Sequence, residues 1–504
     1  MSMAVVKTFA GQGVWAPEVA VEVHLANGLP AFQLVGMAET SVKEARERVR
    51  SALINSGFEF PAKRITVNLA PADIPKHGGR FDLPIAVGIL VASGYLPDTC
   101  LYDIAFVGEL GLNGEIKSVG GLIPILMASA KEGLPLIFPG VNDLDAAIVS
   151  GAIRYPAFDL LSVYEHLAAT KPLKKGVPFT LPDLPDHVLG WDDIIGQAQA
   201  KRALTIAAAG AHNLLMVGPQ GTGKSLLASR LLSLLPPMSE EEALEVAAIV
   251  SVKGDAIVAS QFTTRPMRTP HHTCSAVALT GGGSQIVPGE VSLAHHGVLF
   301  LDELPEFGRK ALEVLREPLE TGDVHISRAS GSATYPANFQ LIAAMNPSPT
   351  GDIDDNRLTP QQQLNYLNRL SGPLLDRIDI QVEVPRLENY DLTPPINNSD
   401  DSIHHAIEQV LVARAIQLER QGKPNAHVNG GELAALCQLS QQDLAFLQAA
   451  AKQLNLSMRV FHRTLKVART LADLDAETKV NRQHLSEALG YRALDTLIKQ
   501  LSTH

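Results

Sequence analysis

Residues 214–225 read LLMVGPQGTGKS, and this stretch decides the fold of the central part of the chain. Four apolar residues precede a loop in which Gly218, Gly223, Lys224 and Ser225 have the spacing G-x-x-x-x-G-K-S, and the run SLLASRLLSLL follows as a helix. Glycines let successive backbone N–H groups surround a phosphate, and the start of the helix adds its positive dipole. The order strand, loop and helix therefore predicts a nucleotide phosphate site.

The residues of this loop have separate expected roles. Lys224 is expected to reach the β- and γ-phosphates of ATP, and Ser225 to hold Mg²⁺. The other positions supply backbone contacts to the nucleotide, and they are Gly218, Pro219, Gln220, Gly221, Thr222 and Gly223. A chance glycine-rich turn is the alternative, and the flanking strand and helix argue against it.

Two further apolar strands end in polar side chains. GVLFLDEL (297–304) ends in Asp302, expected to hold Mg²⁺, and Glu303, expected to polarise the attacking water. The run LIAAMNP delivers Asn346, whose amide is expected to orient that water. A solvated acidic turn and a simple Asn-Pro turn are the alternatives for each taken alone. Together with the loop upstream, the three side chains predict a nucleoside triphosphatase.

Composition along the chain indicates three folded parts. Residues 1–170 alternate strand-like and helical runs, which predicts an α/β fold. Residues 171–190 have the Pro, Gly and Lys content of a linker. The all-apolar strands in 191–390 predict a second α/β domain with a parallel sheet buried on both faces. After a polar linker, 391–402, residues 403–504 favour a small helical domain.

Apolar runs, cysteine content and net charge indicate the cellular compartment and the partners to expect. No apolar run reaches the length of a membrane span, and the first residues lack the pattern of a signal peptide. Cys100, Cys274 and Cys437 are scattered and odd in number, which argues against disulfides and fits a reducing cytoplasm. The net charge of −11 excludes a chain that is basic all over, but it leaves room for a local basic surface.

The motif order resembles that of the AAA+ ATPases, and SGPLLDRIDIQVEV (371–384) resembles their magnesium-chelatase-like branch. Nearly the whole chain resembles the ComM/YifB family, in which a Lon-protease-like domain precedes the AAA+ core and a helical lid. The resemblance rests on long stretches such as GLPAFQLVGMAETSVKEARERVRSAL, IIGQAQAKRALTIAAAGAHNLLMVGPQGTGKS, RPMRTPHHTCS and RVFHRTLKVARTLADLD.

The resemblance implies a homo-hexameric ring with ATP between subunits and with single-stranded or branched DNA in its pore. Such a ring would drive branch migration during recombination and natural transformation. Arg377 would be the arginine finger that reaches a neighbour's ATP, and Arg459 the second sensor arginine. Gly196 and Gln197 would contact adenine. Many relatives carry cysteines after the sensor asparagine, whereas AMNPSPTGDIDDNRLTPQQQ has neither cysteine nor histidine, so no zinc is expected there.

Two segments are candidates for DNA contact. TGDVHISRASGSATYPANF (321–339) is predicted to form a hairpin with Arg328 near its tip, and a purely structural hairpin is the alternative. The loop TTRPMRTPHHT (263–273) collects Arg265, Arg268, His271 and His272, for DNA or for packing between subunits. Adjacent histidines in an extended segment are expected to point to opposite sides, which argues against a metal site.

A third basic set recurs at helical spacing in the last domain: Arg459, His462, Arg463, Lys466 and Arg469. A solvated helix face and a surface for ATP sensing and DNA are both open.

The resemblance also leaves two alternative functions: the motor subunit of a magnesium chelatase, and an ATP-dependent protease. The turn Gly120-Gly121 corresponds to the one that precedes the catalytic lysine of Lon-type domains, but Ile123, Pro124 and Ile125 follow it here. The expected nucleophile loop, 77–90, holds no serine or threonine. Loss of both partners argues against proteolysis. We expect the domain to brace the ring or to add a second tier that faces DNA.

Overall fold

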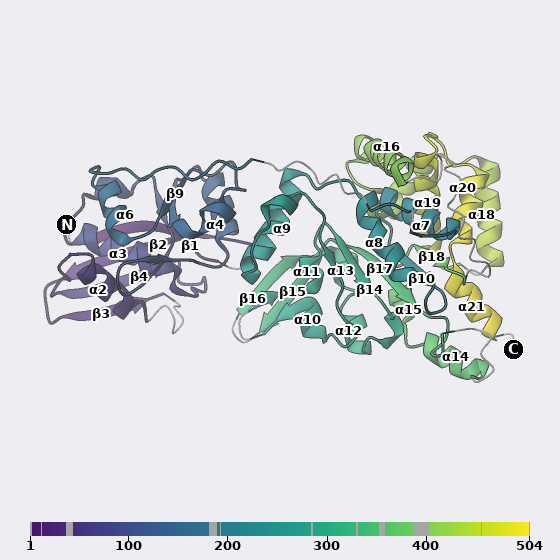
Figure 1. The fold of residues 1–504 in the computed structure, drawn as a ribbon, viewed down its shortest axis with the longest axis horizontal. Coiled ribbons are helices and arrows are strands. Elements are labelled where there is room, and N and C mark those ends of the chain that lie inside the picture. Colours follow the sequence, from purple (N-terminus) through teal and green to yellow (C-terminus); the bar gives the residue numbers. More distant parts are fainter. Residues whose placement is uncertain are drawn as a thin grey trace.

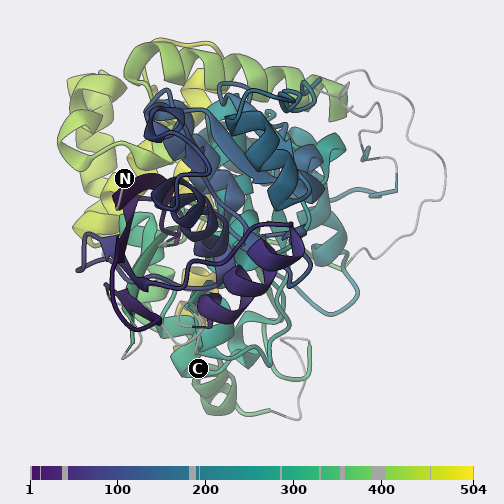
Figure 2. The same cartoon turned by 90° about the vertical axis from the view of Figure 1, so that its left-hand side faces the viewer.

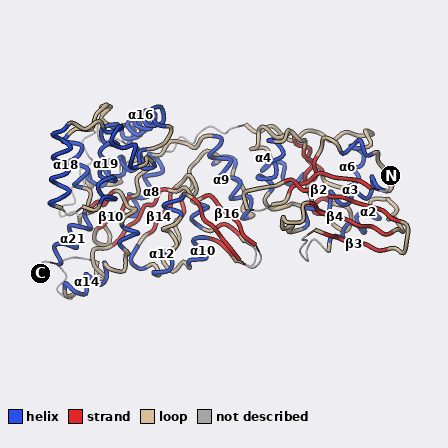
Figure 3. Tube along the Cα trace, turned by 180° about the vertical axis from the view of Figure 1, so that it is seen from behind, coloured by secondary structure: helices blue, strands red, loops and turns tan. Residues whose placement is uncertain are grey.

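The computed structural model describes residues 3–11, 13–36, 44–180, 189–191, 193–283, 286–328, 331–351, 358–386, 403–454 and 456–502. Along the longest axis lie an N-terminal α/β domain, a central α/β domain and a group of C-terminal helices (Figure 1). From behind, the strands gather in the first two parts and the last part is helical (Figure 3). The predicted fold class, mixed α/β with a parallel sheet and a helical C-terminal region, is confirmed.

The N-terminal domain is built on a seven-stranded sheet of order β3-β4-β2-β1-β5-β8-β9. Alternate residues of β2 are buried, as the period of a strand with one face on a core requires. The pairs β1–β2 and β2–β4 are antiparallel, and the other neighbours are parallel. The strands are β1 (Met3–Phe9), β2 (Glu18–Ala26), β3 (Ala31–Val35), β4 (Arg64–Ala70), β5 (Ala105–Phe106), β8 (Leu136–Pro139) and β9 (Arg154–Ala157).

Helices cover this sheet. In α2 (Ala45–Asn55) the buried residues are Ala45, Val49, Ala52 and Leu53, the apolar face that the sequence predicts, and the chain turns at Gly57 with φ 88°. The other helices are α3 (Asp82–Ala92), α4 (Leu122–Lys131), α5 (Asp143–Ala146) and α6 (Leu160–Leu167), and β6 (Glu109–Leu110) pairs with β7 (Ile116–Lys117).

The central domain contains a five-stranded sheet of order β11-β14-β17-β10-β18, parallel throughout. Its three inner strands are fully buried, as their apolar sequences predict. Parallel strands bring the residues that follow β10, β14 and β17 to one edge. The strands are β10 (Leu214–Val217), β11 (Met267–Arg268), β14 (Val298–Leu301), β17 (Gln340–Met345) and β18 (Ile380–Glu383), and the longer helices are α7 (Ala198–Gly210), α8 (Lys224–Leu234) and α9 (Glu240–Lys253).

Smaller elements connect these strands. β15 (Asp323–Arg328) and β16 (Gly331–Pro336) pair antiparallel with Arg328 opposite Gly331, so the predicted hairpin is confirmed; Ala329 and Ser330 of its tip lie outside the described residues. The remaining elements are α10 (Ala276–Thr280), β12 (Gly281–Gly282), β13 (Val287–Pro288), α11 (Glu290–Leu293), α12 (Arg309–Glu313), α13 (Pro318–Thr321), α14 (Pro360–Leu367) and α15 (Gly372–Leu375).

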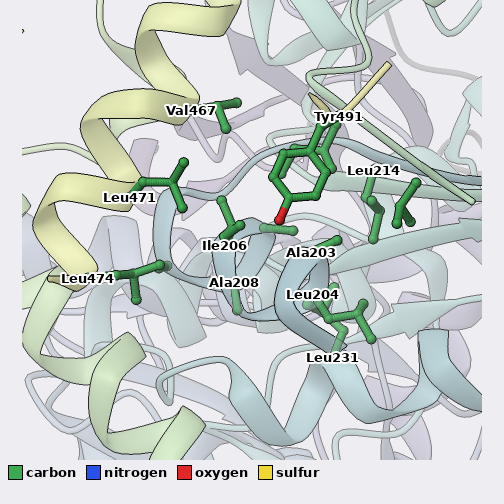
Figure 4. Packing of buried hydrophobic residues seen from close by; sticks show 14 of the residues in the cluster. Ala203, Leu204, Ile206, Ala208, Leu214, Leu231, Val467, Leu471, Leu474 and Tyr491 are labelled. Carbon is green, nitrogen blue, oxygen red and sulfur yellow. The ribbon is translucent and has the colours of Figure 1, made fainter. Parts of the chain in front are cut away.

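The C-terminal helices share one core with the central domain. Val467, Leu471 and Leu474 of α19 lie against residues of α7 (Figure 4). The helices are α16 (Ile403–Gln421), α17 (Gly430–Cys437), α18 (Gln441–Gln453), α19 (Met458–Leu474), α20 (Arg482–Gly490) and α21 (Ala493–Ser502). Within the described part of the chain, no helix is both long and apolar enough to cross a bilayer.

The N-terminal domain lies in front of the central domain in the view along the long axis (Figure 2), and the two meet between α4 and α9. The N–H of Gly121 donates to the carbonyl of Ser251 at 2.9 Å, and the N–H of Ile123 donates to its hydroxyl at 3.3 Å. Apolar residues of α4 and α9 form one buried cluster around this contact. In the linker predicted at 171–190, Phe179 packs edge-on against Phe262 of the central domain.

This junction yields a first prediction. Ala247 on α9 is buried in the shared apolar cluster, so a larger arginine side chain there has no room. We expect Ala247→Arg to cost about 2–3 kcal/mol by overpacking and to loosen the N-terminal domain. Small-angle scattering should show a larger radius of gyration, while Glu241→Arg on the exposed face of α9 should leave it unchanged. An unaltered profile for Ala247→Arg would contradict the contact.

Candidate functional site

The glycine-rich loop surrounds the amine of Lys224. Gly221 and Gly223 have φ of 81° and 86°, which residues with a side chain rarely adopt, and α8 begins directly after them. The amine donates to the carbonyls of Gly218 at 2.8 Å and Pro219 at 2.7 Å, and to Oδ1 of Asn346 at 3.1 Å. Burial lowers the pKa of Lys224, and Asp302 and Glu303 oppose that shift. All three bonded acceptors are uncharged oxygens, so no carboxylate is among the hydrogen-bond partners of the amine.

Close packing also requires glycine at the start of the loop. A Cβ on Gly218 would lie 2.1 Å from the carbonyl oxygen of Val384, a distance that backbone atoms cannot accommodate. The N–H of Val384 in turn donates to the carbonyl of Val217 at 2.8 Å. The loop therefore leaves the sheet at a position fixed by the neighbouring strand β18.

The carboxylates lie beside the loop as the sequence predicts. The hydroxyl of Ser225 donates to Oδ2 of Asp302 at 2.6 Å, and the N–H of Glu303 donates to Oδ1 of the same carboxylate at 2.9 Å. Glu303 has φ 52°, an uncommon backbone state for a residue with a side chain and one that is typical of functional sites. A hydroxyl and a carboxylate in contact are the oxygen ligands that Mg²⁺ prefers. The side chains therefore fit a nucleotide triphosphate with its metal ion.

The predicted adenine contacts lie near the same strands. Gly196 and Gln197 have φ of 61° and 54° and lead into α7. The amide of Gln197 donates to the carbonyl of Pro385 at 2.9 Å, just beyond β18. This turn therefore lies beside the end of β18, the strand next to β10. Its contact with adenine stays a prediction.

The two predicted arginines lie at the opposite end of the strands, where β10 and β18 begin. Arg377 lies three residues before the start of β18, and its backbone carbonyl accepts a hydrogen bond from the side-chain amide of Asn213, which precedes β10. Its guanidinium contacts Glu320 and donates to the carbonyl of Pro373 at 2.7 Å. Arg459 is 68% exposed and lies 3.9 Å from Asp376. Both arginines line one cavity of about 760 Å³, on the side of the sheet away from the loop of their own chain.

The basic loop at 263–273 is engaged within the chain. Arg265 pairs with Glu242 at 2.9 Å and also donates to the carbonyls of Pro236 and His296. Arg268 forms a two-pronged pair with Glu290, at 2.6 and 3.0 Å. DNA contact by these two side chains stays a prediction, and it requires phosphate to compete with existing carboxylate partners.

The expected orientation of the two histidines is wrong. The rings of His271 and His272 stack with centroids 4.1 Å apart, because the chain turns here instead of staying extended. Nδ1 of His272 lies 3.3 Å from Oε2 of Glu303. His272 thus lies beside the carboxylate expected to act on water, a proximity that no sequence signal indicated. In the hairpin, Arg328 lies beside β12, because a Cβ on Gly282 would be 3.3 Å from its Nη2.

The basic side chains of α19 were expected to lie on an accessible helix face, and beyond the first turn of the helix this expectation is wrong. Arg463 donates to the carbonyls of Leu375 and Ile378, and Lys466 to that of Ala426. Burial lowers the pKa of both side chains. Arg469 is only 1% exposed, and it pairs with Asp473 at 2.8 Å. These bases therefore tie the helices to the core.

A second prediction follows from Arg469. Removal of its guanidinium leaves the buried carboxylate of Asp473 with one remaining arginine partner, Arg420. We expect Arg469→Ala to lower the free energy of unfolding by about 3–5 kcal/mol, measured by chemical denaturation. Arg459→Ala, which removes an exposed side chain, should leave the midpoint unchanged. Equal midpoints for both variants would contradict this account of the helical domain.

Sequence reasoning also missed a group around Glu245. Its Oε2 lies 3.0 Å from Nε2 of His295 and 2.7 Å from Nε2 of His296, and among the described residues these three form the one group with metal-ligand geometry. The N–H of Asn338 donates to Nδ1 of His295 at 3.0 Å, so Nε2 of that ring carries its proton and is not free to bind a metal. The hydrogen bonds lower the pKa of Glu245, and the group ties α9 to the start of β14.

The double-glycine turn of the N-terminal domain serves packing. Gly121, with φ 68°, precedes α4, and Leu122, Ile123 and Ile125 behind it are buried. The nucleophile loop expected at 77–90 is wrong, because most of that segment forms α3. Arg80, just before α3, donates to the carbonyl of Gly120 at 3.2 Å, and burial lowers the pKa of its guanidinium to about 10. Ser251 of α9 covers the start of the helix.

The fold and this site define the chain as a magnesium-chelatase-like member of the AAA+ ATPases. The model described as magnesium chelatase, subunit ChlI, matches residues 190–392, and those described as subunit ChlI of Mg-chelatase and as the ChlI C-terminal region match 21–142 and 401–492.

Within this group, the chain belongs to the ComM/YifB family. It is 51% identical to competence protein ComM of Haemophilus influenzae over 508 residues, which cover 100% of both chains. It is 48% identical to YifB of Escherichia coli, with 99% of both chains covered. Identity to the 38 kDa magnesium-chelatase subunit of Rhodobacter capsulatus is 27%, over 59% of this chain and 85% of that protein.

Proposed function

We propose that this protein is an ATP-driven DNA motor, a cytoplasmic hexameric helicase that promotes branch migration during recombination and natural transformation. The observation that carries the ATPase part is the buried amine of Lys224, bonded only to neutral oxygens beside the Ser225–Asp302 pair. The similarity to competence protein ComM and the hairpin inserted between β14 and β17 support the DNA part.

In the proposed reaction the chain's own residues have distinct tasks. Lys224 binds the β- and γ-phosphates, and Ser225 with Asp302 holds the metal ion. Bound Mg²⁺ would supply positive charge to the phosphate oxygens. Glu303 accepts a proton from the attacking water, and Asn346, held at 3.1 Å from Lys224, orients that water.

Arg377 and Arg459 are proposed to act on the ATP of the adjacent subunit. Both line the cavity at the sheet edge away from their own glycine-rich loop, so a neighbouring chain has to bring its nucleotide to them. A ring in which each subunit presents its loop to the cavity of the next satisfies every site at once. This arrangement supports the proposed homo-hexamer.

The DNA strand is proposed to contact the hairpin, with Arg328 near its tip. The strands β15 and β16 carry several exposed residues, so a phosphate has access to them. The N-terminal domain adjoins the hairpin: Ser332, Ala333 and Thr334 share a cavity of about 670 Å³ with Trp15 and Met127 of that domain. Such contact supports a role of the N-terminal domain in bracing the ring beside DNA.

The test measures ATP turnover with and without branched DNA, together with the migration of a labelled four-way junction. We expect turnover to rise with DNA and the junction to move only with ATP. Arg328→Ala should weaken DNA binding and reduce its salt dependence by about one counterion per contact, whereas Arg309→Ala on α12 should not. If ATP turnover is the same with and without DNA and the junction does not move, the proposal of a DNA motor is refuted.

A chelatase motor is the alternative that the Rhodobacter relative favours. That relative aligns with 59% of this chain, so part of this chain has no counterpart in the match. Metal insertion into a porphyrin with partner subunits would establish this alternative and would displace the DNA proposal.

A further inference from the structure

The guanidinium of Arg377 contacts a carboxylate from another segment of the chain. Its Nη2 pairs with Glu320, and its Nη1 donates to the carbonyl of Pro373 at 2.7 Å. The side chain of Arg377 is 16% exposed and that of Glu320 is 65% exposed. Nε of Arg377 is buried without a hydrogen-bond partner among the described residues. Because a guanidinium has five N–H groups, each of the two Nη atoms keeps one N–H for a further acceptor.

The backbone of Arg377 is fixed, whereas its side chain is long. Its N–H donates to the carbonyl of Leu374 at 2.9 Å, and its own carbonyl accepts a hydrogen bond from the side-chain amide of Asn213 at 2.8 Å. These bonds place the Cα atom but leave the torsion angles of the side chain open. An arginine side chain loses much rotamer freedom when it is held in one position. The contacts at the guanidinium, with Pro373 and Glu320, therefore decide where the positive charge lies.

Glu320 belongs to the base of the hairpin. It lies on α13, which ends at Thr321, and the hydroxyl of Thr321 accepts a hydrogen bond from the N–H of Asp323, the first residue of β15, at 3.2 Å. The carbonyl of Gly322 accepts one from the N–H of Ala337, just after β16, at 2.6 Å. These bonds close the hairpin onto α13, so the backbone of Glu320 has a defined position relative to the sheet.

Glu320 also lines the cavity of about 760 Å³ that holds Arg377 and Arg459. The base of the hairpin thus forms part of the wall proposed to receive the ATP of the adjacent subunit. A lone carboxylate in this wall would repel a triphosphate, and the pair with Arg377 offsets that repulsion. Because Glu320 is largely exposed, water screens its charge, so the pair orients the guanidinium without cancelling its positive charge.

We propose that Glu320 is a positioning residue that holds the guanidinium of Arg377 toward the ATP of the adjacent subunit. This inference rests on the proposed function, because it takes Arg377 as the group that acts on that ATP. The carboxylate occupies one N–H of Nη2 and leaves an N–H on each Nη atom for phosphate oxygens. Glu320 itself touches neither the nucleotide nor the attacking water, and its effect passes through Arg377.

The experiment measures ATP turnover of the full chain across ATP concentrations. We expect Glu320→Ala to lower kcat by about 10²-fold, the cost that a misplacement of about 1 Å can have at a reacting centre. KM should stay unchanged, because the glycine-rich loop is intact. Glu320→Gln, which keeps the size of the side chain but loses its charge, should lower kcat by a smaller factor. The matched control is Glu317→Ala, which removes an exposed carboxylate just before α13 and should change neither parameter.

Two further comparisons show whether the effect passes through Arg377 to the neighbouring subunit. A chain that combines Glu320→Ala with Arg377→Ala should be no slower than Arg377→Ala alone, because the two side chains act as one unit. Mixing Glu320→Ala subunits with Lys224→Ala subunits should restore turnover. Some sites then combine an intact loop from the first with an intact pair of Glu320 and Arg377 from the second.

A wild-type or raised kcat in folded Glu320→Ala protein would overturn the positioning role, and so would a further loss of rate in the combined variant. Mixed rings that stay inactive although their subunits have exchanged would also overturn it. If Glu320→Ala is misfolded by thermal unfolding, Glu320→Gln carries the same test, and a wild-type kcat there would overturn the inference. Absence of ATP turnover in the wild-type protein would instead refute the proposed ATPase, which separates the two failures.

Discussion

Lys224→Ala should lower ATP turnover by about 10²–10³-fold, the effect of removing one pre-positioned donor from a reacting centre. The amine lies inside the loop, held by the carbonyls of Gly218 and Pro219 and by Asn346, so no other described side chain takes its place there. Alanine also removes the positive charge that would hold the phosphates, which should weaken nucleotide binding, while the carbonyl of Pro219 keeps its hydrogen bond from the hydroxyl of Thr222. The measurements are turnover at saturating Mg-ATP and titration with a fluorescent nucleotide.

The matched control for this variant is Lys452→Ala, which removes an exposed lysine from α18. It should preserve both turnover and binding, and thermal unfolding should show that both variants are folded. Turnover near the wild-type level in Lys224→Ala would remove the basis for placing the triphosphate in this loop.

Arg377→Ala should lower kcat by about 10³-fold, within the range for arginine fingers, and should leave ATP binding intact. The reason is its place before β18, at the sheet edge that faces away from the loop of its own chain. A subunit without Arg377 keeps a complete phosphate site and fails only to complete that of its neighbour. Binding by titration and turnover by phosphate release separate these two effects.

Mixed rings give the decisive comparison. Lys224→Ala and Arg377→Ala subunits are each expected to be inactive, but a mixture contains sites with an intact loop from one and an intact arginine from the other. Turnover should therefore recover on mixing. The control mixes Arg377→Ala with the double variant, which supplies neither group and should recover nothing. If fluorescence shows that the subunits have exchanged but the mixture still does not hydrolyse ATP, the proposal that Arg377 acts on a neighbouring subunit is contradicted.

The candidate phosphate site could be predicted from the sequence because its signal is local. LLMVGPQGTGKS specifies a buried strand, a glycine loop and a helix start within one short segment, and β10 and α8 have these bounds. The apolar runs before Asp302 and Asn346 specified β14 and β17 equally well. The hairpin followed from alternation around a small-residue tip. In each case, neighbouring residues carry the whole pattern.

Pairings between distant segments could not be predicted in this way. His272 meets Glu303 only because β11 and β14 are adjacent in the sheet. Arg469 repeats at helical spacing like a surface residue, yet it is buried against Asp473 and the carbonyls of Glu477 and Thr478. Charge and spacing give the chemistry of a side chain, whereas its exposure depends on what packs over it.

The sequence by itself determined the strands, the glycine-rich loop and the set of side chains proposed for ATP, because short-range periodicity and turn chemistry specify these. Only the tertiary structure decided at which end of the strands of the central sheet each charged side chain lies. It placed Arg377 away from Lys224, turned Glu303 toward His272, and docked the double-glycine turn on Ser251. The physical reason is that strand order and domain docking arise from burial of apolar surface across the whole chain, which no single segment encodes.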